Sequence, residues 1–240
     1  MKFGKASKKT IALFAAALIL FCSGGVMGTR AIPAIQSATF DSVIQLSTLN
    51  VSIVENGKVV GGTGGAMGKM LADLNGKKLA VGGEYKEVIQ ARNSGTCDEY
   101  ARVIIRKYWT KDGKTATDLT PDLIKLSYQG KDYNSGSWIL DTTESTAERK
   151  VYYYKTVLGK DTDSEPLFDT LSVDSSVISE ENITESKEES GGKTVYTYTY
   201  KYDGYTINVE AEAQAVQTHN AAQAIKSIWG IDASKTGINL

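Results

Sequence analysis

The run over residues 193–217, KTVYTYTYKYDGYTINVEAEAQAVQ, alternates apolar or aromatic residues with polar ones on both sides of Asp203-Gly204. This alternation is typical of β-strands with one buried face, and Asp-Gly suits a tight hairpin turn. With a two-residue loop, Tyr200 lies opposite Ile207 and Tyr198 opposite Val209, and opposed residues share one face of a sheet. We therefore predict that the tyrosine row faces the core of a β-protein, although exposed aromatic rows can also bind sugars or peptides.

The composition agrees with a β-rich globular chain. Of 240 residues, 41% are hydrophobic. The chain contains 13 tyrosines and five phenylalanines, and aromatic residues of this kind favour strands. The first 31 residues carry five of the 27 basic side chains and none of the 28 acidic ones. The remainder is therefore mildly acidic, which argues against binding to nucleic acid or to an anionic membrane.

The N-terminal segment has the layout of a secretory signal peptide. Four lysines precede an apolar run of eleven residues, IALFAAALILF, and the small-residue stretch SGGVMGTRA follows it. The apolar run is far shorter than the roughly 20 residues that span a bilayer. We predict a signal peptide over residues 1–31, cleaved between Ala31 and Ile32, and secretion of residues 32–240 as one domain.

The two cysteines argue against an internal disulfide framework. Cys22 follows Phe21, whereas a lipid-modified cysteine would follow a small residue, and cleavage after Ala31 removes it. Cys97 is then the only cysteine of the secreted chain. The sequence leaves open whether Cys97 is buried, exposed or paired between chains.

Further segments predict strands and turns along the chain. Strands are expected over 38–46, 49–53, 85–92, 100–109, 137–140, 150–158 and 167–173, with tight turns at Asn56-Gly57 and Asp112-Gly113. Short helices are expected around 68–74 and 121–128 and after Asn220, the last ending at Gly230. The acidic, serine-rich stretch 175–192 is predicted to be an exposed loop. We predict an all-β fold: a single jelly-roll or immunoglobulin-like antiparallel β-sandwich with two or three short helices, preceded by the signal-peptide helix.

No motif predicts catalytic chemistry, a cofactor or a metal. His219 is the only histidine, which excludes a zinc site of the HExxH type. The glycine-rich stretch 61–70 has Met70 where a phosphate-binding loop needs Ser or Thr. Asp161, Asp163 and Glu165 lack the spacing of a calcium-binding EF-hand loop. We predict that the protein is not an enzyme and that these residues belong to solvated loops or junctions.

Several segments together resemble the TasA/camelysin family of exported bacterial biofilm-matrix proteins, which a SipW-type signal peptidase processes. The resemblance rests on the following four pieces: GGVMGTRA, ATF…STLNVSIVENG, GEYKEVIQARNSGTCDEYARVIIRKYW and GYTINVEAEAQAVQTHN. It implies a jelly-roll-like sandwich that is secreted, stays near the cell surface and assembles into fibres. In fibre-forming members, the N-terminal segment freed by cleavage adds as a strand to the neighbouring subunit. Camelysin members have also been called metalloproteases, but this chain lacks the histidines for that activity.

The function expected from these observations is structural. The first hypothesis is a subunit of an extracellular matrix or pilus-like fibre that donates residues 32–46, with Ala38, Phe40, Ile44 and Leu46 as the inserted side chains. The expected partners are the signal peptidase and further copies of the chain, and the signal peptide is the only membrane-associated part. The alternative is a monomeric cell-surface adhesion or ligand-binding module with an aromatic cluster around Tyr133 and Trp138.

Overall fold

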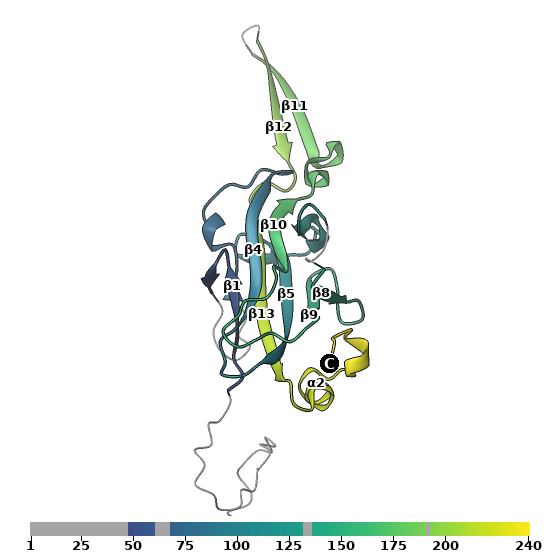
Figure 1. Ribbon diagram of the computed structural model, residues 1–240. Helices are drawn as coiled ribbons and strands as arrows, with labels where there is room; N and C mark the ends of the chain where they lie inside the picture. Colours follow the sequence, from purple (N-terminus) through teal and green to yellow (C-terminus); the bar gives the residue numbers. More distant parts are fainter. Residues whose placement is uncertain (1–47, 61–67, 132–135, 191–192) are drawn as a thin grey trace, which may run out of the picture. The chain divides into compact units, whose positions relative to one another are not determined.

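A computed structural model describes residues 48–60, 68–131, 136–190 and 193–240 of the chain (Figure 1). Within these ranges the protein is mostly β-strand, and all strand pairs are antiparallel, so the predicted all-β class is confirmed. Residues from Leu46 to Leu240 form one compact unit. The predicted signal peptide, its cleavage residues Ala31 and Ile32, and the donor-strand candidates Ala38, Phe40, Ile44 and Leu46 all lie outside the described residues.

The first large sheet has the strand order β2-β1-β4-β10-β7. Its strands are β1 (Val51–Glu55), β2 (Lys58–Val59), β4 (Glu84–Asn93), β7 (Ile124–Ser127) and β10 (Phe168–Val173). The predicted turn at Asn56-Gly57 joins β1 to β2, and both of its residues have positive φ, 49° and 81°. Positive φ at both positions is the geometry of a turn that lets the flanking strands pair.

The second large sheet has the order β3-β13-β5-β9-β8, and β6 pairs beside β5. Its strands are β3 (Gly68–Lys69), β5 (Glu99–Lys111), β6 (Lys114–Ala116), β8 (Trp138–Asp141), β9 (Arg149–Tyr154) and β13 (Tyr205–Gln217). The long strands β5 and β13 pair along their full lengths, from Tyr205 opposite Lys111 to Gln217 opposite Glu99. The predicted reversal at Asp112-Gly113 joins β5 to β6, again with positive φ at both residues.

The two large sheets pack face to face around one hydrophobic core (Figure 1). The first sheet contributes Ile53, Ile89, Ala91 and Leu171, and the second contributes Val103, Ile105, Trp109, Val209 and Ala211. The predicted alternation in β5 and β13 is therefore confirmed, since these residues share the inward face. The predicted division of β9 is confirmed as well: Tyr152 and Tyr154 pack on this core, whereas Val151 and Tyr153 belong to a second cluster.

The second cluster lies on the outer face of the β5–β9–β13 sheet. The helix α2 (Ala221–Trp229) covers this face with Ala221, Ile225 and Trp229, against Tyr100, Ile104 and Val216 of the strands. The helix ends at Gly230 as predicted, with φ 74°. Asn220 occupies the cap position, but its side chain makes no capping hydrogen bond, and its carbonyl accepts from Gln223 and Ala224 instead. None of the helices in the described residues is long and apolar enough to cross a membrane.

The predicted hairpin between residues 193–202 and 205–217 is wrong. The strand β12 (Lys193–Tyr200) pairs with β11 (Ile183–Ser190), so Tyr198 lies opposite Glu185 instead of Val209. At Asp203-Gly204 only Gly204 has positive φ, 81°, and the N–H of Tyr205 donates to the carbonyl of Tyr202 over 3.5 Å. A turn of this geometry splays its flanking strands instead of pairing them.

The tyrosine row is consequently exposed and does not belong to the core. Tyr196, Tyr198 and Tyr200 are 53%, 53% and 48% exposed. The stretch 175–192, predicted as a loop, contains the short 3-10 helices η3 (Ser175–Ile178) and η4 (Glu180–Asn182) and then β11. Figure 1 shows β11 and β12 as a separate hairpin that continues from the ends of β10 and β13.

Two other short elements differ from the expectation in extent. The predicted helix over 68–74 is in part a strand, β3, followed by the 3-10 helix η1 (Ala72–Leu74). The predicted helix over 121–128 is confined to η2 (Pro121–Leu123), where the Thr120 hydroxyl accepts the N–H of Asp122 as a cap, and β7 follows directly. A last 3-10 helix, η5 (Ala233–Lys235), packs beside α2.

Candidate functional site

Within the described part of the chain, the edge of β13 that faces away from β5 is paired over only a small part of its length. Among the described residues, its strand partner there is β3, which meets Glu210 and Ala211. The N–H of Met70 donates to the carbonyl of Val209 over 2.9 Å, so the odd-numbered residues of β13 direct their backbone groups toward this edge. Ala213, Ala215 and Gln217 therefore present N–H and C=O groups to the edge, beyond the end of β3.

A groove of about 320 Å³ runs beside this part of β13. Its walls come from the start of β1, from four consecutive residues of β13 and from α2: Leu49, Asn50, Val51, Glu212, Ala213, Gln214, Ala215 and Ile228. The two alanines point to the core side of the strand, where Val51 lies, whereas Ile228 is 57% exposed on the other side. An extended segment placed here would meet backbone groups along its length and apolar side chains on both of its faces.

A larger groove of about 1030 Å³ lies at the opposite end of the same strand. It is lined by residues 69–72 and 74–79 and by Trp109, Leu119, Val177, Tyr202 and Val209, together with other residues of β13. The Tyr205 hydroxyl donates to Asp118 over 2.5 Å, and Lys111 Nζ lies 4.7 Å from the Tyr205 ring centroid. Its hydrogen bond to Asp118 raises the pKa of Tyr205 to about 12, so this hydroxyl is a neutral donor at physiological pH.

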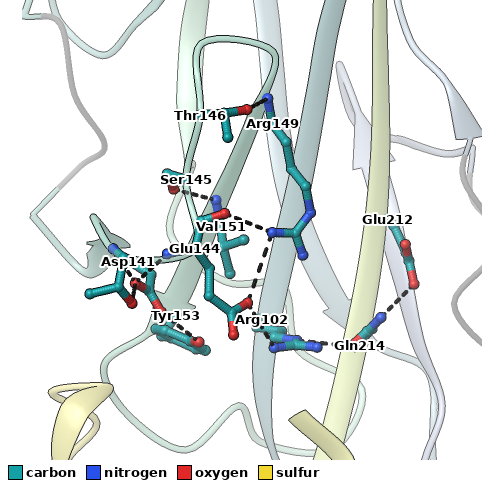
Figure 2. Close-up of polar contacts among 11 residues, drawn as sticks. Arg102, Asp141, Glu144, Ser145, Thr146, Arg149, Val151, Tyr153, Glu212 and Gln214 are labelled. Carbon is teal, nitrogen blue, oxygen red and sulfur yellow. Dashed lines mark hydrogen bonds and ion pairs between the residues drawn. The ribbon is translucent and has the colours of Figure 1, made fainter. Parts of the chain in front are cut away.

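A polar network occupies the outer side of the second sheet (Figure 2). Asp141, at the end of β8, accepts the N–H and hydroxyl of Thr143, the N–H of Glu144 and the hydroxyl of Tyr153 over 2.6–3.1 Å. Burial alone would raise the pKa of Asp141, but the hydrogen bonds from Thr143 and its neighbours leave it lowered. Burial and the bond to Asp141 raise the pKa of Tyr153 to about 12. The pKa values of both groups are shifted away from 7, whereas general acid–base catalysis requires a pKa near the working pH.

Arg102 connects this network to β13. Its Nε donates to Gln214 over 2.8 Å, Gln214 donates to Glu212, and a guanidinium nitrogen lies 4.0 Å from Glu144 (Figure 2). Arg102 is 6% exposed, and its guanidinium carbon lies 5.1 Å from the Trp229 ring centroid of α2. The arrangement ties β5, β13, α2 and the loop after β8 together, which is a structural role.

Besides Asp141, three acidic side chains of the described residues are buried, and no pattern in the sequence identified them. Glu55 and Glu87 lie on the inner face of the first sheet, and Glu99 lies at the start of β5; they are 3%, 0% and 0% exposed. Burial raises the pKa of Glu87 to about 8 and that of Glu99 to about 7. The signal that could have revealed Glu87 is its phase, since it lies on the same face of β4 as Tyr85, Ile89 and Ala91.

The structure separates the residues that sequence reasoning singled out. His219 is exposed at the junction of β13 and α2, as predicted. Asp163 pairs with Arg92 over 2.8 Å, and in the described part of the chain no group of three or more acidic, cysteine or histidine side chains is placed to hold a metal. Cys97 is half-buried, with no disulfide partner among the residues described.

An exposed aromatic cluster was expected around Tyr133 and Trp138, but Trp138 is buried. Trp138 is 2% exposed, and its indole N–H donates to the carbonyl of Glu165 over 2.9 Å. Tyr133 lies outside the described residues. Among the described residues, the exposed aromatic side chains are instead Tyr196, Tyr198 and Tyr200 of β12.

No family model, curated protein or solved structure matches this chain. The features of the chain that bear on its function are the edge of β13, its grooves and the sequence that precedes β1.

Proposed function

We propose that this protein is a secreted structural subunit of an extracellular matrix or pilus-like fibre, assembled by strand donation. Residues 32–46 of one subunit, freed by cleavage between Ala31 and Ile32, would add to the open edge of β13 in the next subunit. In this proposal the protein is located outside the cell and at its surface. It acts without a cofactor and has no enzymatic activity.

The observation that carries the proposal is the edge of β13, which the described residues leave mostly unpaired beside a groove. Ala213 and Ala215 direct backbone groups to this edge, and their small side chains leave the 320 Å³ groove between β1 and α2. The proposed donor has a related pattern, because Ala38, Phe40, Ile44 and Leu46 fall on one face of an alternating run that Ser42 interrupts. In β-augmentation, backbone hydrogen bonds supply affinity and alternate side chains enter pockets.

The sequence resemblance to the TasA/camelysin family points to the same function. It carries the expectation of a jelly-roll topology, of processing by a SipW-type signal peptidase and of self-association into fibres. The two-sheet antiparallel arrangement is compatible with a jelly roll. The family assignment itself is part of the proposal.

Electron microscopy of three variants tests strand donation. The chain beginning at Ile32 should form fibres, whereas a chain lacking residues 32–46 should not. Ala215→Pro should also prevent fibres, because proline removes the edge-directed N–H while the ladder to β5 keeps its bonds. Ala215→Ser, which keeps that N–H, is the matched control. Fibres from the truncated chain, equal fibres from both Ala215 variants, or no fibres from any chain would refute the proposal.

A second candidate function is a monomeric cell-surface adhesion or ligand-binding module. The exposed Tyr196, Tyr198 and Tyr200 favour it, since tyrosine rows provide flat apolar surfaces with a polar hydroxyl. Glycan-array and peptide-array binding that disappears in Tyr198→Ala, from a chain that stays monomeric, would support this function over the fibre subunit.

A further inference from the structure

The hairpin of β11 and β12 has two faces in water and, among the described residues, no third strand. All eight residues of β12 are exposed, including Val195 at 53%. A two-stranded hairpin alone is only marginally stable in water, and a long apolar edge strand is a template for pairing with another chain. The question is which of its two edges is suited to pairing, and with what.

The hydrogen-bond phase of the hairpin shows which backbone groups point to the free edge of β12. The N–H of Lys201 donates to the carbonyl of Asn182 over 2.9 Å, one step beyond the pair of Tyr200 and Ile183. Bonded pairs alternate in an antiparallel ladder, so the odd-numbered residues of β12 bond to β11. Thr194, Tyr196, Tyr198 and Tyr200 therefore direct their N–H and C=O groups to the free edge.

The two edges of the hairpin differ in charge. The strand β11 carries Glu185, Glu188 and Glu189 with one lysine, whereas β12 carries only Lys193, at its end. Like charges placed directly opposite each other destabilise a strand pair. Two β11 edges would oppose acidic side chains, but two β12 edges can meet without opposing any charge within 194–200. The β12 edge is thus suited to pair with an identical edge.

We propose that β12 pairs antiparallel with β12 of a second copy of this chain, about a two-fold axis at Tyr198. In this register Tyr198 lies opposite its own counterpart, and Tyr196 lies opposite Tyr200 in both directions. The result is a four-stranded sheet, β11-β12-β12-β11, with three tyrosine pairs on one face and threonine pairs on the other. Such an isologous contact closes after two copies.

The contact is expected to be weak between isolated molecules. Each copy contributes about one strand, which is fewer than the roughly 20–30 residues per side of a standard interface. A reversible dimer is therefore expected at high protein concentration. This contact does not depend on strand donation, because it uses neither residues 32–46 nor the edge of β13.

Site-directed cross-linking tests the register in the chain beginning at Ile32, with Cys97→Ser to remove the native thiol. Opposed residues of a bonded pair have Cα atoms about 5.5 Å apart, within the range of a disulfide. Tyr198→Cys should give a disulfide-linked dimer under mild oxidation. Glu185→Cys, on β11 directly beside Tyr198, is the matched control and should give at least tenfold less dimer. Equal dimer from both positions, or none from Tyr198→Cys, would overturn the proposal.

Sedimentation of chains without an added cysteine provides a second measurement. The dimer dissociation constant should rise at least tenfold in Tyr198→Lys, which opposes two lysines at the axis, and stay within about twofold in Glu185→Lys. A chain that is monomeric at all concentrations, but binds glycans or peptides through these tyrosines, would overturn self-pairing. Because neither measurement requires fibres, their failure is distinguishable from a failure of strand donation.

Discussion

The carboxyl group of Glu87 lies against that of Glu55 inside the sandwich, and the two strands that carry them are neighbours in the first sheet. Burial raises the pKa of Glu87 to about 8, and the hydrogen bond and charge of Glu55 act in the same direction. Glu55 in turn accepts the N–H groups of Leu71 and Ala72 over 2.5 and 3.1 Å. At neutral pH Glu87 therefore keeps its proton beside Glu55, and Glu55 holds the chain around η1 against β1.

This pair predicts that the free energy of unfolding falls as the pH rises from about 4.5 to about 8. The pKa of Glu87 is about 8 in the folded protein and near 4.5 when unfolded, so the folded state retains a proton that the unfolded state releases. The stabilisation is complete below pH 4.5 and declines as the pH rises toward 8. Glu87→Gln keeps a neutral donor to Glu55, so its free energy of unfolding should depend less on pH, measured by urea unfolding between pH 5 and pH 9.

Glu84→Gln is the control for this prediction, because Glu84 is an exposed residue of the same strand. Its unfolding free energy should follow that of the unmodified chain at each pH. If Glu87→Gln and Glu84→Gln show the same pH dependence, Glu87 does not hold its proton in the folded state.

Glu99 predicts a second pH effect at the other end of the sandwich. Burial raises its pKa to about 7, and a hydrogen bond from the backbone of Asn50 offsets this only in part. The folded state therefore loses the stabilisation from protonated Glu99 as the pH rises from 4.5 to 7. The shift in pKa corresponds to about 3 kcal/mol of unfolding free energy. Glu99→Gln should be more stable than the unmodified chain at pH 7 but not at pH 4.5, as measured by urea unfolding. A stability difference that does not vary between these two pH values would contradict the assignment.

Local alternation predicted much of the fold from sequence. The inward residues Val103, Ile105 and Trp109 of β5, and Val209 and Ala211 of β13, follow from side chains that switch faces at each residue of a strand. The pairing of these strands with each other could not be predicted, because the paired positions are at least 94 residues apart in the sequence, as for Lys111 opposite Tyr205. Register between distant strands depends on the whole sheet and has no local signal.

The tyrosine row shows why local rules fail at the hairpin. Three dipeptides, Asn56-Gly57, Asp112-Gly113 and Asp203-Gly204, look alike, but only the first two have positive φ at both residues. The third leaves β12 to pair with β11, whose glutamates are unfavourable in strands. The open edge of β13 was likewise beyond prediction, because an edge is a property of the assembled sheet.

Because α2 covers the outer face of the sheet, substitutions of two isoleucines in this helix should change the free energy of unfolding by very different amounts. Ile225 is fully buried against the sheet, whereas Ile228 is 57% exposed. Ile225→Ala should lower the free energy of unfolding by about 2–5 kcal/mol, because it removes buried methyl groups and leaves a cavity. Ile228→Ala should change it by no more than about 0.5 kcal/mol. Urea unfolding at pH 5 measures both, and similar losses from the two variants would mean that α2 does not pack as described.

Trp138 and Tyr198 distinguish an aromatic residue of the core from one of the surface. Trp138 is 2% exposed, its ring lies 5.0 Å from that of Tyr154, and its indole N–H is bonded to Glu165. Trp138→Ala should therefore cost about 3–5 kcal/mol of unfolding free energy and impair every function through loss of the fold. Tyr198→Ala should leave the unfolding transition of the sandwich in place, because Tyr198 contacts neither core cluster. Thermal unfolding followed by tryptophan fluorescence compares the two variants. If Tyr198→Ala loses as much stability as Trp138→Ala, the tyrosine row belongs to the core.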